Sequence, residues 1–263
     1  MKYWHLLIDE KPESGSWNMS VDEYLFQSLG EEHHTYLRFY TWKRPTVSLG
    51  YSQMASKVVD ADYCRNNGID IVRRITGGKL VLHYNEVTYS VCSSDEILFT
   101  STLADSYRLI SEALIKGLEK MGIKARLAAS PPESYSRSHH PCFSYPAKDE
   151  VEISGDKIIG SAQKRVGKNF LQHGSIPLEE HDDMLRSISF SQGKDEPIRM
   201  ISLSQTLGKM VDFTWVVSRL VKGFAEYFGV ELRSKSLSPA EIDRISQIQH
   251  ERHGHPDWVF RVS

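Results

Sequence analysis

The sequence predicts an α+β fold with a mixed, mostly antiparallel sheet that helices flank. Three observations support this prediction. Short segments of alternating hydrophobicity follow one another across tight turns, as hairpin strands do, for example around residues 154–156. Two long amphipathic helices are expected, and they do not alternate with strands as the crossovers of a parallel sheet would. Hydrophobic residues make up 40% and charged residues 25% of the 263 positions, which suits a protein with a sizeable core.

Helices are expected where apolar residues recur every three or four positions. The expected helices are residues 17–29, a short one from about residue 60 to Gly68, residues 102–121, residues 213–228, and a last one that begins at Ser238. Ser16 is the candidate N-cap of the first helix, and Thr102 is that of the third. Ser238, Pro239 and Glu241 combine an N-cap, an N1 proline and an N3 glutamate in one start signal.

Strands are expected where hydrophobicity alternates or where short apolar runs are bounded by turn residues. The expected strands are residues 35–41, 46–51, 69–74, 80–83, 87–92, 123–128, 150–153, 157–165 and 169–177. The strand at 46–51 is expected to pair with the one before it across the turn at 43–45. The chain then becomes mainly helical, and the region around 195–197 is a connection rather than a boundary. We therefore expect one domain over residues 1–263.

Charge and cysteine content narrow the functional classes. The formal net charge is −2, which gives no overall attraction to nucleic acid or to an anionic membrane, so neither is expected as a partner. The N-terminus lacks the apolar core of a signal peptide, and no apolar run is long enough to span a bilayer. Three cysteines without metal-site spacing favour a reducing compartment over a disulfide framework. We therefore expect a cytoplasmic protein.

Cys142 is the candidate nucleophile. Cys92 continues an apolar strand and Cys64 lies in a helical segment, so both suit the usual role of cysteine as a small buried hydrophobe. Cys142 instead follows the polar segment 136–141, which contains histidines and an arginine. Positive charge near a thiol favours the thiolate, which is the form that attacks a thioester. The residues alone leave Cys142 open between a catalytic nucleophile and a third structural cysteine.

Gly77 and Gly78 mark a second candidate site. A glycine pair is often only a tight turn, but glycine also lets the backbone approach a ligand and present its amides. Two arginines before the pair and a histidine after it favour the binding role. The residues of this segment that we expect to bind substrate are Arg73, Arg74, Thr76, Gly77, Gly78 and His83.

Histidines in two other places have competing interpretations. His173, on an expected strand, is either an ordinary core histidine or part of the wall of a substrate tunnel, and we expect it to bind substrate rather than to act as the base. The spacing of His250, His253 and His255 matches no established zinc pattern. We expect these three to lie at a solvated helix end, and we expect no metal site.

Seven motifs, in this order along the chain, resemble the biotin/lipoate protein ligase superfamily. Within it they resemble most the octanoyltransferases of lipoate assembly that carry a Cys-Phe-x-x-Pro motif. The motifs are Trp17–Glu23, Trp42–Gln53, Arg73–His83, Cys142–Pro146, Asp156–Gln163, Gln172–Leu178 and Pro256–Trp258.

This resemblance implies a single biotin/lipoate-ligase-like catalytic domain and an acyltransferase. It implies transfer of an octanoyl group from acyl carrier protein, through a thioester on Cys142, to a lysine of a lipoyl-domain protein such as the glycine cleavage H protein. No cofactor is expected, since one thioester replaces another. The resemblance adds Gly160, Ser161, Ala162 and Gly174 to the substrate-binding residues.

Lys157 is the second catalytic residue that the resemblance implies. At the shoulder of a hairpin a solvated lysine is the ordinary expectation, and such a residue contributes little to stability. In the superfamily a lysine in this setting contacts the acyl carbonyl, where it would stabilise developing negative charge. Acidic carrier proteins would meet a positive rim that consists of Arg73, Arg74, Lys79, Lys157, Lys164, Arg165 and Lys168.

Three other functions remain open from the sequence. An ATP-dependent lipoate–protein ligase shares the glycine loop and the lysine, although ligation needs no cysteine and the chain ends near Trp258, with no room for the usual accessory domain. An amidotransferase would move the acyl group between lipoyl domains, also through a cysteine. A non-catalytic binder of acylated carriers belongs to a different class. Leu80 stands where the family has a smaller alanine, which leaves the preferred acyl length open.

Overall fold

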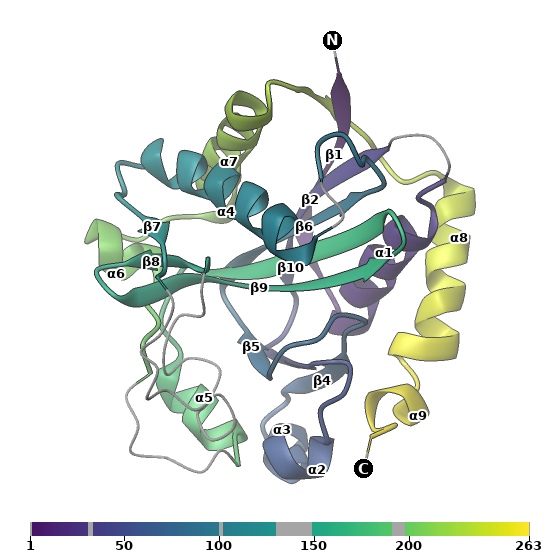
Figure 1. The fold of residues 1–263 in the computed structure, drawn as a ribbon. Helices are drawn as coiled ribbons and strands as arrows, with labels where there is room; N and C mark the ends of the chain where they lie inside the picture. Colours follow the sequence, from purple (N-terminus) through teal and green to yellow (C-terminus); the bar gives the residue numbers. More distant parts are fainter. Residues whose placement is uncertain (1, 31–33, 100–101, 130–148, 191–197, 263) are drawn as a thin grey trace.

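Figure 1 shows the computed structural model, which describes residues 2–30, 34–99, 102–129, 149–190 and 198–262. Within these ranges the largest element is an eight-stranded sheet. Its strands, from edge to edge, are β11 (Glu231–Ser234), β1 (Tyr3–Glu13), β2 (Thr35–Trp42), β6 (Glu86–Ser93), β10 (Asn169–Pro177), β9 (Asp156–Val166), β8 (Val151–Ile153) and β7 (Arg126–Leu127). β1 runs parallel to β11 and β2, and the other neighbours are antiparallel. The expected fold class is confirmed.

The strand at 46–51 does not pair as expected. It forms β3 (Thr46–Leu49), which pairs in parallel with β4 (Asp70–Arg73) and antiparallel with β5 (Val81–His83) in a second, three-stranded sheet. The physical reason is burial on both sides, because all four residues of β3 are buried. Val47 and Leu49 pack in a separate core, with Ala55 of helix α2 (Ala55–Val58) and Cys64 of α3 (Ala61–Asn66).

Two long helices cover one face of the large sheet (Figure 1). These are α4 (Leu103–Glu119) and α7 (Phe213–Phe228), close to their expected bounds, and their apolar stripes meet strand residues in the main core. The two helices cross closely at a pair of glycines. A Cβ atom on Gly223 would lie 2.3 Å from the backbone nitrogen of Gly117, so this crossing has no room for a side chain.

The opposite face of the sheet carries α1 (Gly15–Gln27). Successive residues of β10 face the two sides of the sheet in turn. Phe170 packs in the core with α4 and α7, whereas Leu171 packs in the core with α1. The N-cap of α1 is Ser14 rather than the expected Ser16, because the Ser14 hydroxyl accepts the hydrogen bond from the Trp17 amide at 3.2 Å.

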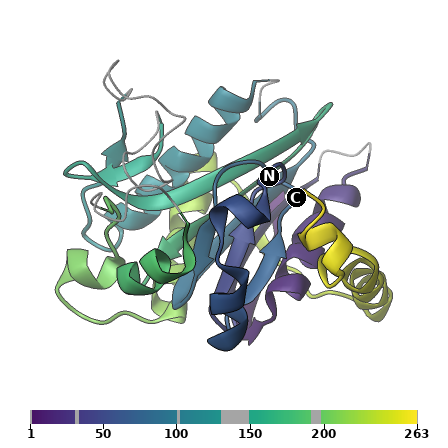
Figure 2. The ribbon, with the colours of Figure 1, turned by 90° about the horizontal axis from the view of Figure 1, so that it is seen from below.

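The C-terminal part of the chain packs along α1. It contains α8 (Pro239–Ile248), a π-helical turn (Gln249–His253) and α9 (Pro256–Val259), drawn in yellow at the side of the molecule in Figure 2. Ser238 and Glu241 form the expected capping box at the start of α8. Two shorter helices, α5 (Asp182–Ile188) and α6 (Leu203–Leu207), follow β10. Among the described helices, none has both the length and the apolar character that a bilayer crossing requires.

Candidate active site

The glycine loop, residues 76–79, joins β4 to β5 and rests on the large sheet. Gly77 and Gly78 are exposed. The Thr76 hydroxyl lies 2.7 Å from Nε2 of His173 on β10, and a Cβ atom on Gly78 would come within 3.7 Å of the Ala162 side chain on β9. The structure therefore brings the expected loop residues together with two of the expected sheet residues.

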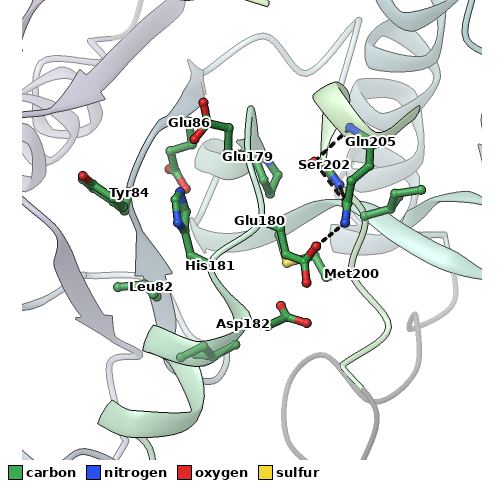
Figure 3. Close-up of a pocket in the computed structure, with 13 residues that line it drawn as sticks. Leu82, Tyr84, Glu86, Glu179, Glu180, His181, Asp182, Met200, Ser202 and Gln205 are labelled. Atoms are coloured by element: carbon green, nitrogen blue, oxygen red, sulfur yellow. Dashed lines mark hydrogen bonds between the residues drawn. The ribbon is translucent and has the colours of Figure 1, made fainter. Parts of the chain in front are cut away.

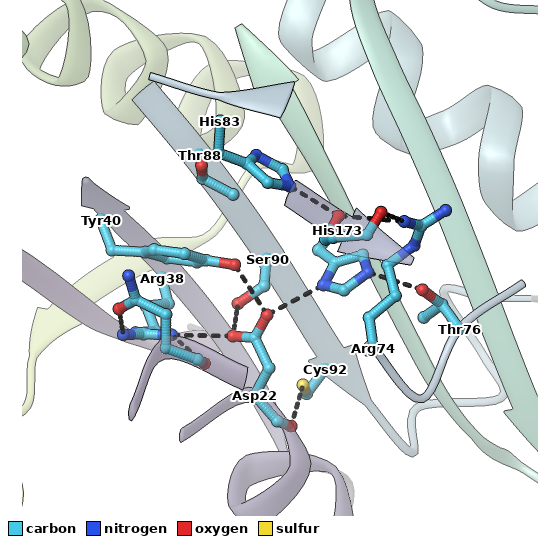
Figure 4. Close-up of polar contacts among 12 residues, drawn as sticks. Asp22, Arg38, Tyr40, Arg74, Thr76, His83, Thr88, Ser90, Cys92 and His173 are labelled. Carbon is cyan, nitrogen blue, oxygen red and sulfur yellow. Dashed lines mark hydrogen bonds and ion pairs between the residues drawn. The ribbon is translucent and has the colours of Figure 1, made fainter. Parts of the chain in front are cut away.

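A series of buried hydrogen bonds connects Thr76 of the loop to the interior of the protein (Figure 4). The Asp22 carboxylate accepts hydrogen bonds from Nδ1 of His173, Nη1 of Arg38 and the Tyr40 hydroxyl, each at 2.9 Å. Burial alone would raise the pKa of Asp22, but the hydrogen bond from His173 and the charge of Arg38 outweigh it and hold the pKa below its ordinary value. Asp22 is therefore an ionised carboxylate inside the protein.

His173 is neutral and orients the loop. Burial lowers the pKa of His173 more than Asp22 raises it. Because an ionised carboxylate only accepts hydrogen bonds, the proton of the neutral ring lies on Nδ1, and Nε2 accepts from the Thr76 hydroxyl. Both ring nitrogens are thereby engaged. This supports the expectation that His173 is not the base, and it places the residue directly under the loop.

A second chain of buried groups reaches the loop from the small sheet (Figure 4). Nδ1 of His83 lies 2.8 Å from a Glu86 carboxylate oxygen, and its Nε2 lies 2.7 Å from the Ser48 hydroxyl. The Trp42 ring stacks on His83 with centroids 4.1 Å apart. Arg74 donates to the Ser48 hydroxyl at 3.0 Å and thereby joins this chain to the loop.

Arg73 and Arg74 were expected to belong to an exposed positive rim, and this expectation is wrong. Arg74 is 4% exposed and its Nη2 donates to the carbonyl oxygens of Gly77 at 2.8 Å and Lys79 at 2.7 Å. Arg73 is fully buried and donates to the carbonyl oxygens of Gly50 and Val259, both at 2.8 Å. Arginine has five donors in a rigid fork, so each side chain can hold several carbonyl groups at once. Both residues shape the backbone around the loop.

A third carboxylate–histidine pair supports the same segment from the C-terminus. His253 is 1% exposed, so the expectation that it lies at a solvated helix end is wrong, whereas His250 and His255 are exposed. Nε2 of His253 lies 2.7 Å from a Glu23 oxygen, and Nδ1 lies 3.2 Å from the Arg73 carbonyl oxygen. Across the described ranges, no cluster of histidine, cysteine and acidic side chains is arranged to hold a metal ion.

The acidic members of these pairs, Asp22, Glu23 and Glu86, were not predicted from the sequence. Asp22 and Glu23 end the motif Trp17–Glu23, and Glu86 follows His83 by three residues. Proximity to a histidine in sequence could have indicated Glu86. Asp22 lies 151 positions from His173, and nothing local indicates that pairing.

Lys157 is buried at the start of β9, which corrects the expectation of a solvated hairpin lysine. Its side chain is 3% exposed and its Nζ lies 2.7 Å from a Glu150 oxygen. Its amide donates to the Arg199 carbonyl and its own carbonyl accepts from the Ile201 amide, both at 2.9 Å, so a neighbouring segment fixes its backbone. A Cβ atom on Gly160 would lie 3.0 Å from Cε of Lys157. The absence of a side chain at Gly160 therefore makes room for the lysine.

Gly174 lies on β10 next to this lysine site. A Cβ atom there would come within 2.6 Å of the Tyr89 ring and within 2.7 Å of both the Gly160 carbonyl oxygen and the Ser161 hydroxyl. The Tyr89 and Ser161 hydroxyls lie 2.6 Å apart, and burial raises the pKa of Tyr89 to about 12. Gly160, Ser161 and Gly174 thus lie together, as expected, beside Lys157.

Figure 3 shows a further pocket of the structure. Met200 lines this pocket and pairs with Lys157 in an isolated β-bridge. Its walls combine apolar side chains with Glu180 and Asp182, and burial together with the charge of Glu180 raises the pKa of Asp182 to about 6. The remaining lining residues are Leu82, Tyr84, Glu86, Pro177, Glu179, His181, Leu185, Ile201, Ser202 and Gln205.

Two of the three cysteines are poor nucleophiles. Cys64 and Cys92 are buried free thiols. Burial raises the pKa of Cys64 to about 11 and the pKa of Cys92 well above its ordinary value, so neither forms a thiolate near neutral pH. Cys142 lies outside the described residues, and its role stays a prediction. Leu80, which left the acyl length open, packs in the core of the small sheet.

Comparisons with known proteins identify relatives along the whole length of this chain. The family model of the lipoyl protein ligase A/B catalytic domain matches residues 14–225. The octanoyltransferase LipM of Carboxydothermus hydrogenoformans is 35% identical, and that of Kyrpidia tusciae is 37% identical. Each match covers 99% of this chain and all of the relative. These relatives confirm the expected enzyme class, an acyltransferase.

A solved structure shows the same fold. The bipartite lipoate protein ligase of Thermoplasma acidophilum aligns with a TM-score of 0.82 and 23% identity, over all of this chain and 98% of that one. An identity this low supports the fold and no finer statement. The family model and the two full-length relatives together show that this chain belongs to the lipoyl protein ligase A/B catalytic domain family.

Proposed function

We propose that this acyltransferase moves an octanoyl group from acyl carrier protein to a lysine of a lipoyl-domain protein, such as the glycine cleavage H protein, in lipoate biosynthesis. The relatives that match along the whole chain carry the name octanoyltransferase, which supports the octanoyl group.

The observation that carries the proposal is the buried ammonium group of Lys157 beside Gly160. Its distance of 2.7 Å from Glu150 and its fixed backbone hold the charge in place before any substrate arrives. Acyl transfer places negative charge on the carbonyl oxygen in each tetrahedral intermediate. A preorganised positive charge in a site that excludes water stabilises such an oxyanion far more than it would in bulk water.

In the proposed reaction Cys142 is the nucleophile of the first step. Its thiolate attacks the carbonyl carbon of the donor thioester, the new carbon–sulfur bond forms, the bond to the donor sulfur breaks, and the donor leaves as a thiolate. The acceptor amine then attacks the enzyme thioester, the amide bond forms, and Cys142 leaves as a thiolate while the amine loses a proton. The raised pKa values of Cys64 and Cys92 support Cys142 as the one reactive cysteine.

The reaction proposed here needs no nucleotide, because the donor thioester already holds the activated acyl group. Thioester exchange is close to balanced, and conversion of a thioester to an amide is favourable. We also propose that residues 1–263 form one domain, since β1 and β11, from opposite ends of the described chain, pair in the same sheet. The three cysteines without metal-site spacing support a cytoplasmic location.

Transfer assays with two acyl sources test this proposal. We expect octanoyl-acyl carrier protein to modify a lipoyl domain with no nucleotide present, and we expect free octanoate with ATP and magnesium to give no product. Modification can be followed by the mass of the lipoyl domain. ATP-dependent attachment of free octanoate or lipoate, undiminished in a Cys142→Ala variant, would replace the transferase with the ligase.

A further inference from the structure

A surface patch of aromatic rings and cations lies beside the glycine loop. This aromatic–cationic patch consists of Phe26, Tyr51, Lys164, Arg252, Trp258 and Arg261. The Arg261 guanidinium lies 3.8 Å from the centroid of the Tyr51 ring and 4.7 Å from that of Trp258. Nζ of Lys164 lies 5.5 Å from the Tyr51 ring and 5.9 Å from the Phe26 ring. Four distant parts of the sequence therefore meet in one patch.

The patch is continuous with the proposed active site. The amide of Tyr51 donates to the carbonyl oxygen of Thr76 at 2.9 Å, and Nη2 of Arg261 donates to the Tyr51 carbonyl oxygen at 2.9 Å. Tyr51 is thus one hydrogen bond away from the residue that precedes Gly77. A molecule seated on the patch lies next to the exposed glycines of the loop.

The residue types of the patch suit a protein interface. Tyrosine, tryptophan and arginine dominate the binding energy of such interfaces. Tyr51 is 40% exposed although its ring contacts two cations, and the Arg252 side chain is 43% exposed over Trp258. Rings and stacked guanidinium groups lose little conformational freedom when a partner binds. Arg252 also pairs with Glu23, so the positive charge that the patch offers comes from Lys164 and Arg261.

We infer that the aromatic–cationic patch is the docking surface for the acceptor, an acidic protein domain that presents its lysine to the glycine loop. This inference rests on the proposed function. A lysine side chain reaches only the length of its four-carbon stem, so the acceptor must dock immediately beside the loop. A donor that delivers its acyl group on a long prosthetic arm has no such requirement. The contact between Tyr51 and Thr76 places the patch at the short range that the acceptor needs.

The two steps of the reaction can be measured separately to test this inference. Octanoyl-enzyme is formed from the donor, purified, and mixed with increasing concentrations of an apo lipoyl domain. For Arg261→Glu and for Lys164→Glu we expect the half-saturating acceptor concentration to rise by about tenfold or more, because the reversed charge repels an acidic surface. Lys164 is thereby assigned to the acceptor rather than to both acidic carriers, so the rate of the first step, acylation by the donor, should stay within about twofold of wild type. Arg261→Glu also removes the hydrogen bond that Arg261 donates to the Tyr51 carbonyl oxygen. Lys164→Glu removes no hydrogen bond to the loop, so its effect reports the change of charge.

Arg233→Glu is the matched control. Arg233 is also an exposed arginine stacked on a tyrosine, 4.1 Å from the Tyr3 ring, but it lies on the edge strand β11. We expect this variant to leave both steps unchanged. Unchanged acceptor saturation in Arg261→Glu and Lys164→Glu would overturn the inference. A loss confined to the donor step would also overturn it and would assign the patch to the donor.

The design also separates this inference from the proposed function. If no octanoyl-enzyme forms even in the wild type, the thioester mechanism has failed, and binding of the apo lipoyl domain to unacylated enzyme can still be titrated. Weaker binding in both patch variants, with Arg233→Glu unchanged, would support the docking surface on its own. Equal binding by all four proteins would reject it.

Discussion

Lys157 and Glu150 form an ion pair that is almost entirely withdrawn from water. Their side chains are 3% and 11% exposed. Removal of one member breaks this buried ion pair, which typically costs about 3–5 kcal/mol of folding free energy. A Lys157→Ala variant would therefore lose stability as well as the charge that the proposed mechanism uses, and its activity alone could not be interpreted.

A paired substitution separates stability from catalysis at this position. Lys157→Met/Glu150→Gln removes both charges of the pair together, so we expect most of the stability lost in Lys157→Met to return. Turnover should stay reduced by roughly 100-fold or more, because the preorganised charge is gone. Urea unfolding and single-turnover kinetics on both variants measure the two effects. Near-wild-type turnover in the double variant would remove Lys157 from the mechanism.

The buried histidine His173 makes folding stability depend on pH. Its folded-state pKa is lowered from 6.5. As the pH falls below 6.5, the unfolded chain takes up a proton that the folded chain refuses, so stability decreases until the folded-state pKa is reached. The lowered pKa of Asp22 adds a contribution that is present above 3.8 and is lost only at lower pH.

We expect the free energy of unfolding to fall between about pH 7 and pH 5, and we expect a His173→Gln variant to show a smaller decrease over the same interval. His5 and His181 also have lowered pKa values and keep part of the slope in this variant. Asp182, whose pKa is raised to about 6, opposes the slope in both proteins, because the folded chain takes up this proton first as the pH falls. Urea titrations at several pH values give the comparison. An equal slope in both proteins would show that His173 titrates alike in the folded and unfolded chains.

The position of the glycine loop is set by elements that are far apart in the sequence. Two of its three carboxylate–histidine supports start from α1, through Asp22 and Glu23, and the third starts from β6, through Glu86. Their histidines come from β10, the π-helical turn and β5. The loop therefore keeps its shape only when the large sheet, the small sheet and the C-terminal helices are all in place.

Gly50 tests how far activity depends on the position of this loop. A Cβ atom on Gly50 would lie 2.0 Å from the Gly78 carbonyl oxygen, so Gly50→Ala must displace the loop. A displacement of about 1 Å at a catalytic site can cost roughly 100-fold in rate. We expect a loss of that order, measured as turnover per folded molecule.

Two other glycines serve as controls for Gly50→Ala. Gly30→Ala meets nothing within 4 Å and should leave activity and stability unchanged. Gly223→Ala crowds the crossing of α4 and α7, and overpacking of this kind typically costs about 1–3 kcal/mol of stability. The molecules of that variant that remain folded should keep their activity. Equal losses of activity in Gly50→Ala and Gly30→Ala would contradict the account of the loop.

Local signals explain which elements could be predicted from the sequence. Helix α7 and strand β10 have their expected bounds, because periodicity and flanking turn residues lie within each segment. The pairing of β3 could not be predicted, since it depends on a core shared with α2 and α3. Strands β1 and β11 were missed for a similar reason, because their parallel pairings, β1 with β2 and β11 with β1, join segments that are not adjacent in the sequence.

The residues of the candidate site also differ in whether local sequence signals reveal them. Lys157, Gly160 and Gly174 lie in short motifs, and the structure places them side by side, while their roles stay predictions. The buried roles of Arg73, Arg74 and His253 were not found, because a sequence does not show whether an arginine faces solvent or backbone carbonyl groups. The acidic partners Asp22 and Glu23 act across 151 and 230 positions of sequence.

At the scale of the whole molecule, the fold alone does not decide between a transferase and a ligase. The lipoate protein ligase of Thermoplasma acidophilum has the same fold as this chain. The distinction lies in how the acyl group is activated. A transferase receives it as a thioester and needs a reactive cysteine, whereas a ligase activates a free acid with ATP and needs none.

The most direct test of the account is to ask whether the enzyme itself becomes acylated. Wild-type protein is incubated with octanoyl-acyl carrier protein in the absence of nucleotide, and intact mass analysis with peptide mapping locates the octanoyl group. We predict one octanoyl group per chain, on Cys142, with Cys64 and Cys92 unmodified because burial raises the pKa of both thiols. An octanoyl group on either of those two cysteines, or acylation that persists in Cys142→Ala, would contradict the account.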